Sequence, residues 1–256
     1  MKIILVGAGN LATQLGHALH QAGHDLPQVY SHTMTSAQLL ADQIGAEPTD
    51  DIDALATDAD LYIIAVKDRA LSEVISRLCP SRRSQVFVHT AGSMPMDVFK
   101  GQADHYGVFY PMQTFSKNRA VDFHVIPTFL EWNDAEAENL IQSMATSVTN
   151  RIYHLPTADR KYLHLAAVWA CNFTNHCYEV SANLLARHGI PFDVMLPLID
   201  ETAHKVHTLT PHEAQTGPAV RYDENVIRAQ SALLSDIPRL RELYELLSKD
   251  IHEVNS

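Results

Sequence analysis

Two glycines near the N-terminus stand at a spacing that suits phosphate binding by a backbone loop. Residues 7–12 read Gly-Ala-Gly-Asn-Leu-Ala, the G-x-G-x-x-A form. The first glycine allows a tight turn, the second lets a pyrophosphate approach, and the small last residue lets a helix pack on a strand. The helix N-terminus then offers free N–H groups to the phosphates. The predicted dinucleotide contacts are Gly7, Gly9, Asn10, Leu11 and Ala12.

Two alternatives to dinucleotide binding remain for this loop. One is a glycine-rich turn without a ligand, and the other is a similar loop that binds S-adenosylmethionine. A methyltransferase usually has an acidic residue just before its glycine-rich loop, and here the preceding residue is Val6.

The residues after the second predicted strand bear on which dinucleotide binds. An acidic residue there would bind the ribose hydroxyls and repel a 2′-phosphate. The chain instead has Ser31, His32 and Thr33, whose hydroxyls and imidazole can donate to a phosphate. Asp25 lies at the opposite end of the strand. We therefore predict NADP as the cofactor, with NAD less favoured; a polar turn that contacts no ligand is the alternative.

Two other segments follow predicted strands, at residues 65–68 and 89–93. Ligands of open α/β sheets bind beyond the carboxyl ends of the strands, so both segments are expected to face the cofactor. The predicted contacts are Ala65, Val66, Lys67 and Thr90, with Ser93 on the nicotinamide side. Asp68 is interpreted as a helix N-cap rather than a ligand contact. For His89, a structural and a catalytic role remain equally open.

A long helical segment in the second half carries a polar stripe. The members recur every three or four residues: Lys161, His164, Val168, Asn172, Asn175, Glu179 and Asn183. Asparagine is a poor choice for a solvated helix face, because its side chain competes for the backbone. We therefore expect the end from His164 to Asn172 to face a cleft, with a solvated face as the alternative. Arg221, after a rigid Gly-Pro turn, can grip a carboxylate or phosphate.

Composition excludes several classes of protein. With 46% hydrophobic and 19% charged residues, the chain is ordinary for a globular protein. A net charge of −11 disfavours binding to nucleic acid and to anionic membranes. Three cysteines form no disulfide framework, which fits a cytoplasmic protein. Histidines 17, 20, 24, 204 and 207 lack carboxylate or cysteine partners at ligand spacing, so no metal is predicted.

The elements that must position these residues change in character near residue 155. Before it, short apolar runs alternate with helical patterns, which predicts a mostly parallel α/β sheet. The predicted strands are 2–6, 28–31, 61–66, 85–89, 106–110, 125–130 and 151–155, and the predicted helices are 11–21, 35–44, 69–78 and 134–146. After it, only helices are predicted, at 158–188, from Asp193 to 209, from Asp223 to 234, and from Pro238 onward. We predict a dinucleotide-binding Rossmann domain at 1–154 and an all-helical substrate and dimerisation domain at 155–256.

Several segments together resemble a known family, the Rossmann-like NADP oxidoreductases with a C-terminal helical domain of unknown function. They belong to a wider group with pyrroline-5-carboxylate reductase, F420-dependent NADP oxidoreductase and 6-phosphogluconate dehydrogenase. The matching positions are residues 7–10, 31–33, 89–92, 110–115 and 216–223, with His164 and Asn172. The chain departs from the family pattern at His32 in place of arginine, Ala91 in place of serine, Tyr110 in place of histidine and Tyr222 in place of glycine.

The resemblance implies hydride transfer between NADP(H) and a small carbonyl or imine, in a cleft between the two domains. His164 and Lys161 are the candidate proton donors, Asn172 an orienting amide, and Arg221 an anion anchor. Ser93 and Thr90 are expected beside the nicotinamide. The alternative from another class is a sensor module that binds NADP(H) without turnover.

The long helix also carries an apolar stripe that predicts a homodimer. Its members are Leu163, Ala166, Ala170, Phe173, Cys177, Val180 and Leu184. A small helical domain covers only one side of such a helix, and the resembling family buries it partly against a second subunit. We therefore expect a homodimer with an interface above about 2,000 Å².

Overall fold

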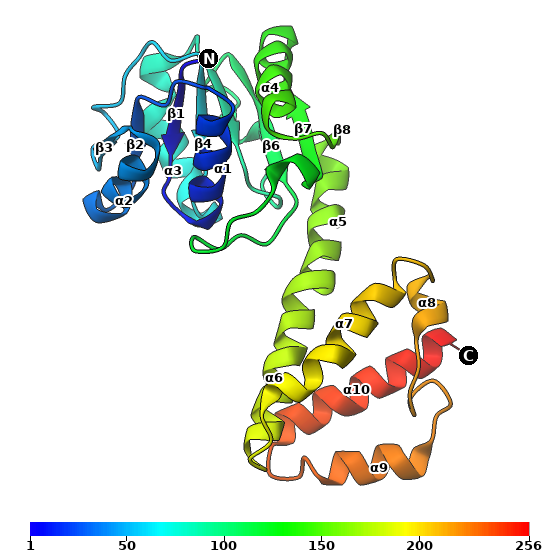
Figure 1. The fold of residues 1–256 in the computed structure, drawn as a ribbon. Helices are drawn as coiled ribbons and strands as arrows, with labels where there is room; N and C mark the ends of the chain where they lie inside the picture. The colour runs from blue at the N-terminus through cyan, green and yellow to red at the C-terminus, as the bar shows by residue number, and fades with distance from the viewer. Residues whose placement is uncertain (256) are drawn as a thin grey trace. The chain divides into compact units, whose positions relative to one another are not determined.

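The computed structural model describes residues 1–255. The chain divides into two compact units, Met1–His176 and Cys177–Ser256, and each is described by itself (Figure 1). The predicted boundary at 154–155 coincides with the end of the last strand, whereas the compact units divide later. The first turns of the following helix belong to the first unit because Arg160 is buried there and pairs with Glu131 of the sheet.

A mostly parallel sheet forms the framework of the first unit, which confirms the predicted fold class. The strand order is β3-β2-β1-β4-β5-β6-β7-β8, and only the β6–β7 pair is antiparallel. The strands are β1 Ile3–Val6, β2 Gln28–Tyr30, β3 Glu47–Thr49, β4 Leu61–Ile64, β5 Val86–His89, β6 His105–Pro111, β7 Thr128–Trp132 and β8 Ile152–His154. The carboxyl ends of β1, β2, β4, β5 and β6 therefore meet at one edge.

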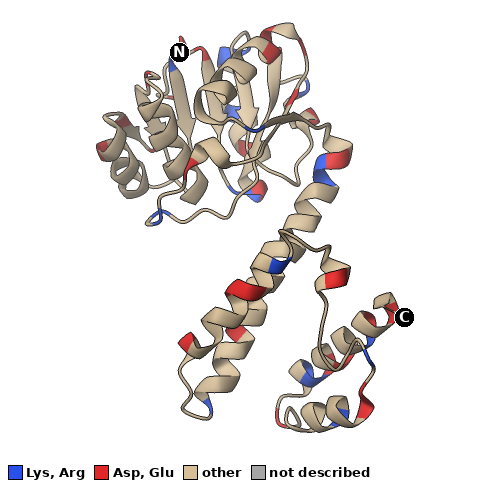
Figure 2. Cartoon of the chain, turned by 45° about the vertical axis from the view of Figure 1, so that its right-hand side comes forward, with Lys and Arg blue, Asp and Glu red and all other residues tan. Residues whose placement is uncertain are grey.

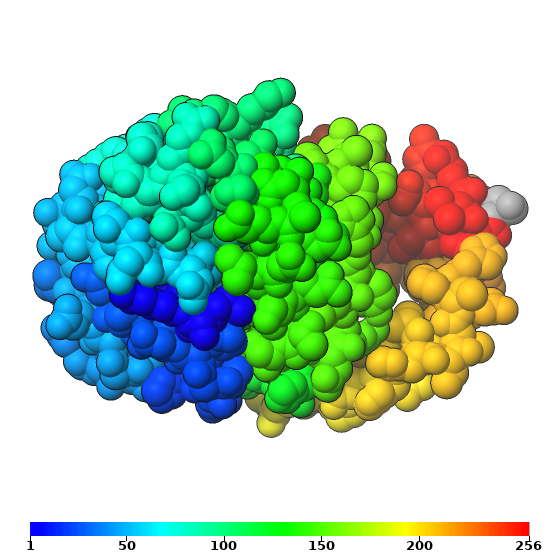
Figure 3. Space-filling model, turned by 90° about the horizontal axis from the view of Figure 1, so that it is seen from above, coloured from blue at the N-terminus to red at the C-terminus, as the bar shows by residue number. Residues whose placement is uncertain are grey.

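Helices cover both faces of this sheet. They are α1 Asn10–Gln21, α2 Met34–Ile44, α3 Asp68–Leu78 and α4 Ala135–Val148. Alternate residues of a strand point to opposite faces, so Ile3 and Leu5 pack in one apolar core with α1, α2 and α4. Ile4 and Val6 pack in the other core with α3. In the space-filling view the N-terminal segment lies against the green segment that contains α4 (Figure 3).

The predicted helix ends agree with the structure where a glycine or a capping side chain terminates the helix. Gly23 after α1 and Gly45 after α2 have φ angles of 81° and 71°, the left-handed conformation that glycine adopts without strain. Asp134 accepts hydrogen bonds from the backbone N–H groups of Glu136 and Ala137 at 3.1 and 2.9 Å, and thereby begins α4.

Two strands differ from their prediction. The short strand β3 was not expected, and its Pro48 is tolerated because β3 lies at the edge of the sheet. The strand predicted at 125–130 begins instead at Thr128, since Phe123–Val125 form a 3₁₀ turn. In that turn Asp122 accepts a hydrogen bond from the backbone N–H of His124.

The predicted long helix spans its expected range with one irregular stretch. It consists of α5 (Thr157–Ala167), a π-helical turn (Val168–Phe173) and α6 (Thr174–Ala186), and Gly189 follows with φ 67°. A π-helical turn inserts about one extra residue, which rotates the following positions by about 100°. The prediction of stripes at constant helical spacing is therefore wrong beyond Phe173, where the π-helical turn ends. Asn175 does not continue the face on which His164 lies.

The second unit is helical, and residues 155–255 contain no strand. It contains α7 Leu196–Lys205, α8 Pro211–Ala214, α9 Glu224–Ala232 and α10 Pro238–Asn255. The start of α10 at Pro238 confirms the prediction. Asp193 is not a helix cap, because it lies inside the 3₁₀ turn Phe192–Met195 that precedes α7. Helix α7 also ends at Lys205 rather than residue 209, and the unpredicted α8 begins with a capping box between Thr210 and Glu213.

Among residues 1–255, no helix has both the length and the apolar character needed to cross a membrane. Charged side chains are nevertheless scarce along one part of the long helix. No Lys, Arg, Asp or Glu occurs between Lys161 and Glu179. The helical turns after the start of α5 are therefore tan in Figure 2.

Candidate cofactor and substrate site

The glycine loop after β1 has the geometry that its spacing predicts. Gly7 has φ +128°, and a Cβ atom there would lie 2.3 Å from the carbonyl oxygen of Ala65. Only glycine therefore allows β1 and β4 to lie this close at their carboxyl ends. Gly9 is the N-cap of α1, and a Cβ atom there would meet no atom within 4 Å. The space in front of Gly9 is open to a ligand.

A cleft of about 700 Å³ lies over this loop. We call it the loop cleft. It brings together many of the predicted cofactor contacts, namely Gly7, Gly9, Ser31, His32, Ala65, Val66 and Lys67. The other lining residues are Ala8, Tyr30, Ser36, Ile52, Arg69, Ala70, Glu73, Val74, Arg77 and Lys117. The glycine loop, the strand ends and helix α3 thus form a single concave site, at the edge where the sheet topology places it.

Five predicted contacts do not line the loop cleft, namely Asn10, Leu11, Ala12, Thr33 and Thr90. Ala12 is fully buried, where it packs α1 against the sheet. The Thr33 hydroxyl donates to Ser36 Oγ at 2.9 Å. The Thr90 backbone N–H donates to the carbonyl oxygen of Ile64 at 3.2 Å. Their predicted ligand roles remain predictions.

The loop cleft is rich in cations although the chain as a whole is acidic. Lys67, Arg69, Arg77 and Lys117 line it, with Glu73 as its only acidic residue. The last three of these cations were not predicted. A sequence signal existed for two of them, since residues 69, 73 and 77 stand four apart and share one face of a helix. Lys117 had no local signal, because a long loop carries it to the cleft.

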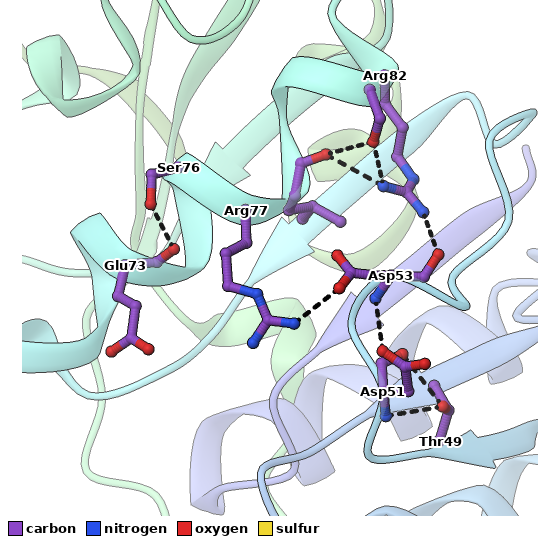
Figure 4. Close-up of polar contacts among 9 residues, drawn as sticks. Thr49, Asp51, Asp53, Glu73, Ser76, Arg77 and Arg82 are labelled. Atoms are coloured by element: carbon purple, nitrogen blue, oxygen red, sulfur yellow. Dashed lines mark hydrogen bonds and ion pairs between the residues drawn. The ribbon is translucent and has the colours of Figure 1, made fainter.

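Two arginines of α3 differ in how their charge is compensated. Arg77 forms an ion pair with Asp53, with 2.8 Å between Nη2 and Oδ2 (Figure 4). Asp53 is itself held in place by Arg82, which lies in the 3₁₀ turn after α3. The Arg82 guanidinium donates to the backbone carbonyl oxygens of Asp53 and Leu55. Arg69 forms no ion pair with any of residues 1–255. Its guanidinium is therefore available to an anion.

The backbone at Lys117 is tied to the first helix. The buried Gln14 amide of α1 donates to the carbonyl oxygens of Ser116 and Lys117 at 2.8 and 3.1 Å. These bonds hold the loop after β6 beside the glycine loop. Lys117 therefore lies at the cleft by virtue of a fixed backbone position.

A second cleft of about 510 Å³ lies beside the long helix. We call it the helix cleft. Its lining residues are Tyr110, Met112, Gln113, Thr114, Leu163, His164, Ala166, Ala167, Val168, Ala170, Cys171 and Asn172. His164 and Asn172 thus share one cleft, as their predicted roles require. The π-helical turn contributes Asn172, and such turns are frequent at functional sites.

Tyr110 and Gly92 hold the imidazole of His164. Tyr110 Oη and His164 Nδ1 are 3.0 Å apart, and the two rings meet edge to face. A Cβ atom on Gly92 would lie 2.6 Å from His164 Nδ1, so only glycine allows this approach. Burial raises the pKa of the Tyr110 phenol, which keeps it protonated at neutral pH. Nε2 is therefore the nitrogen of His164 that is left for a ligand.

The comparisons with known proteins identify this arrangement. The model of a Rossmann-like domain matches residues 1–111, and the model described as a domain of unknown function, DUF2520, matches residues 126–251. A candidate NADP oxidoreductase from Bacteroides fragilis is 52% identical, with 98% of each chain covered and a TM-score of 0.95. The chain belongs to the Rossmann-like DUF2520 family. The resemblance stated from the sequence is thereby confirmed.

More distant structures share the fold of this DUF2520 protein. A protein from Thermotoga maritima is 21% identical over 99% of both chains, with a TM-score of 0.82. An imine reductase from Myxococcus stipitatus, solved in complex with NADP⁺, is 15% identical. The superposition covers all of this chain and 93% of the imine reductase, with a TM-score of 0.70.

The loop after β5 contacts His164 of the helix cleft and Asp68, which stands between two residues that line the loop cleft. The Ser93 hydroxyl donates to the carboxylate of Asp68, and Gly92 of the same loop contacts His164. Asp68 is the first residue of α3, whose N-cap is Lys67, so its interpretation as a cap is wrong. Its carboxylate instead orients Ser93, the predicted nicotinamide contact.

His89 of the DUF2520 protein is a structural residue. Its side chain is fully buried, stacks on Phe99, and lines neither cleft. Nδ1 accepts from the N–H of Ala91 at 3.2 Å, and Nε2 donates to the carbonyl oxygen of Pro95 at 3.3 Å. Burial, with a smaller contribution from the Arg160 charge, lowers its pKa to about 4. The imidazole is neutral at pH 7.

Three residues predicted for the catalytic site, Ser93, Lys161 and Arg221, line neither cleft. Lys161 Nζ lies 5.1 Å from the centre of the Tyr162 ring. Arg221 belongs to the second unit, in the turn before α9. At the end of that turn Asp223 occupies the N-cap position, although its side chain makes no capping hydrogen bond. Within residues 1–255 no three His, Cys, Asp or Glu side chains group as metal ligands do.

Proposed function

We propose that this protein is an NADP(H)-dependent oxidoreductase that transfers a hydride between NADP(H) and a small carbonyl or imine. The observation that carries the proposal is the cationic loop cleft over an open glycine loop, in a chain of net charge −11. A pyrophosphate and a 2′-phosphate are the anions that such a cleft suits. The 52% identical candidate NADP oxidoreductase supports the same cofactor.

The distance across the sheet suits a dinucleotide. From β2 to β5 there are three strand spacings, or about 15 Å. With its adenosine beside Ser31 and His32 and its pyrophosphate over Gly9, a dinucleotide would extend toward the loop after β5. That loop includes Gly92, which contacts His164. The proposed nicotinamide position is therefore next to the helix cleft.

The residues of the helix cleft suit the proton transfer that accompanies hydride transfer. Bound NADPH would supply the hydride to the substrate carbon. In the reduction, the protonated imidazole of His164 gives its Nε2 proton to the substrate oxygen or nitrogen, and Nδ1 keeps its proton, with Tyr110 Oη as acceptor. The Asn172 amide orients the substrate by hydrogen bonding. Lys161 and Arg221 remain further candidates, as proton donor and anion anchor.

Substitution of Gly9 by valine tests the cofactor site. We expect a folded protein that has lost NADPH binding, because the new side chain enters open space where the pyrophosphate would lie. The unchanged protein should bind NADPH at least about tenfold more tightly than NADH. Nicotinamide fluorescence measures both affinities, and thermal unfolding checks the fold. Unaltered NADPH binding by the valine variant would show that the loop is not the phosphate site.

A screen for turnover separates an enzyme from a sensor. NADPH oxidation is followed through the absorbance of the reduced nicotinamide, with a panel of small ketones and imines. With an active substrate, His164→Ala should lower turnover by about 10²-fold and leave NADPH affinity within about a factor of three. NADPH binding without turnover of any compound in the panel would favour the sensor.

We also propose a cytoplasmic homodimer. Large apolar side chains stand exposed along the uncharged stretch of the long helix, namely Tyr162, Leu165, Trp169 and Phe173. Covering them by a second copy would remove much apolar surface from water. Light scattering at micromolar concentration should give twice the mass of one chain, and Trp169→Arg should shift it toward a monomer. A monomeric unchanged protein would rule the dimer out.

A further inference from the structure

The turn after β2 is the place where the sequence predicts that a 2′-phosphate binds. That turn holds Ser31, His32 and Thr33, and it contains no arginine or lysine. The loop cleft nevertheless contains guanidinium groups, both of which belong to α3. Of these, only Arg69 has no acidic partner among residues 1–255.

The topology places Arg69 at the level of the turn after β2. Helix α3 follows the carboxyl end of β4 and begins at Asp68, so its first turn lies at the same edge as the carboxyl end of β2. Arg69 is the second residue of the helix. Arg77 stands eight residues later, which is about 12 Å farther along the helix.

The charge of Arg77 is already compensated. Its ion pair with Asp53 measures 2.8 Å, and Figure 4 shows the guanidinium turned toward that carboxylate. To bind a phosphate, Arg77 would first have to leave Asp53. Arg69 can bind a phosphate without breaking an existing interaction, because its exposed side chain makes no hydrogen bond or ion pair within residues 1–255.

We infer that Arg69 is the residue that makes this protein select NADP over NAD, by pairing its guanidinium with the 2′-phosphate across the loop cleft from Ser31 and His32. The inference rests on the proposed function, since it presumes dinucleotide binding. A guanidinium matches phosphate geometry with two parallel N–H donors, which an imidazole cannot offer. The serine hydroxyl and the imidazole would complete the phosphate site from the opposite wall.

The test compares three single variants, Arg69→Gln, Arg77→Gln and His32→Gln, in the full-length protein. Dissociation constants for NADPH and NADH are measured by nicotinamide fluorescence, and 2′,5′-ADP serves as a competing probe. Arg69→Gln should weaken NADPH and 2′,5′-ADP binding by about tenfold or more, and NADH binding by less than about twofold. Because the exposed Arg69 side chain makes no hydrogen bond or ion pair within residues 1–255, the thermal unfolding of the Arg69→Gln variant should stay unchanged.

The matched variants should behave differently. Arg77→Gln should change the affinities for NADPH and NADH by a similar factor, and Arg69→Lys should restore part of the NADPH preference. If His32→Gln or Arg77→Gln removes the preference and Arg69→Gln keeps it, the inference is overturned while the proposed function stands. If the unchanged protein binds neither cofactor, both fail.

Discussion

Replacing Arg160 by methionine should lower the free energy of unfolding by about 3–5 kcal/mol. The Arg160 side chain is 1% exposed, and its guanidinium pairs with Glu131 and donates to the carbonyl oxygen of Met94. The variant leaves the Glu131 carboxylate buried without its counter-charge, although Thr157 still donates to it through its N–H and hydroxyl. Denaturant unfolding at pH 7 measures the loss.

Two controls separate the buried charge from the loss of an arginine as such. Arg83→Met breaks an exposed pair with Asp104 and should cost about 1 kcal/mol or less. The double variant Arg160→Met, Glu131→Leu removes both buried charges and should recover much of the stability. A loss below about 1 kcal/mol for Arg160→Met would show that the pair does not anchor α5 to the sheet.

The second large effect is a loss of stability in mild acid, caused by His89. Burial lowers the pKa of His89 from 6.5 to about 4. Between these values the unfolded chain binds a proton that the folded protein does not, so stability falls as the pH falls from about 6.5 to 4. The full shift corresponds to about 3 kcal/mol. Burial also lowers the pKa of His24, which adds in the same direction.

Denaturant unfolding at several pH values between 7 and 4 measures this dependence. His89→Gln should flatten it, because an amide can still accept from Ala91 and donate to Pro95 but takes up no proton. His20→Gln, at an exposed position at the end of α1, should leave the dependence unchanged. If the His89→Gln variant keeps the full pH dependence, other groups cause the loss of stability in acid.

Much of the cofactor site could be predicted from adjacent residues. The glycine loop at 7–12 is recognisable because a tight turn, a phosphate and a close helix each constrain a position within six residues. Gly7 and Gly9 indeed line the loop cleft. On the long helix, regular spacing also predicted that His164 and Asn172 share a cleft. The same spacing failed beyond Phe173, because a π-helical turn depends on packing rather than on residue type.

The amino-acid sequence by itself determined the class of fold, the glycine loop, and the face of the long helix that carries His164. Tertiary structure alone decided which distant side chains complete the clefts. Gln14 holds Lys117 across 103 positions of the chain, and Tyr110 reaches His164 across 54. The order of strands in the sheet brings such residues together, and that order follows from the packing of the whole core. The strand order cannot be predicted from a local sequence pattern, because periodicity describes only neighbouring residues within one helix or strand.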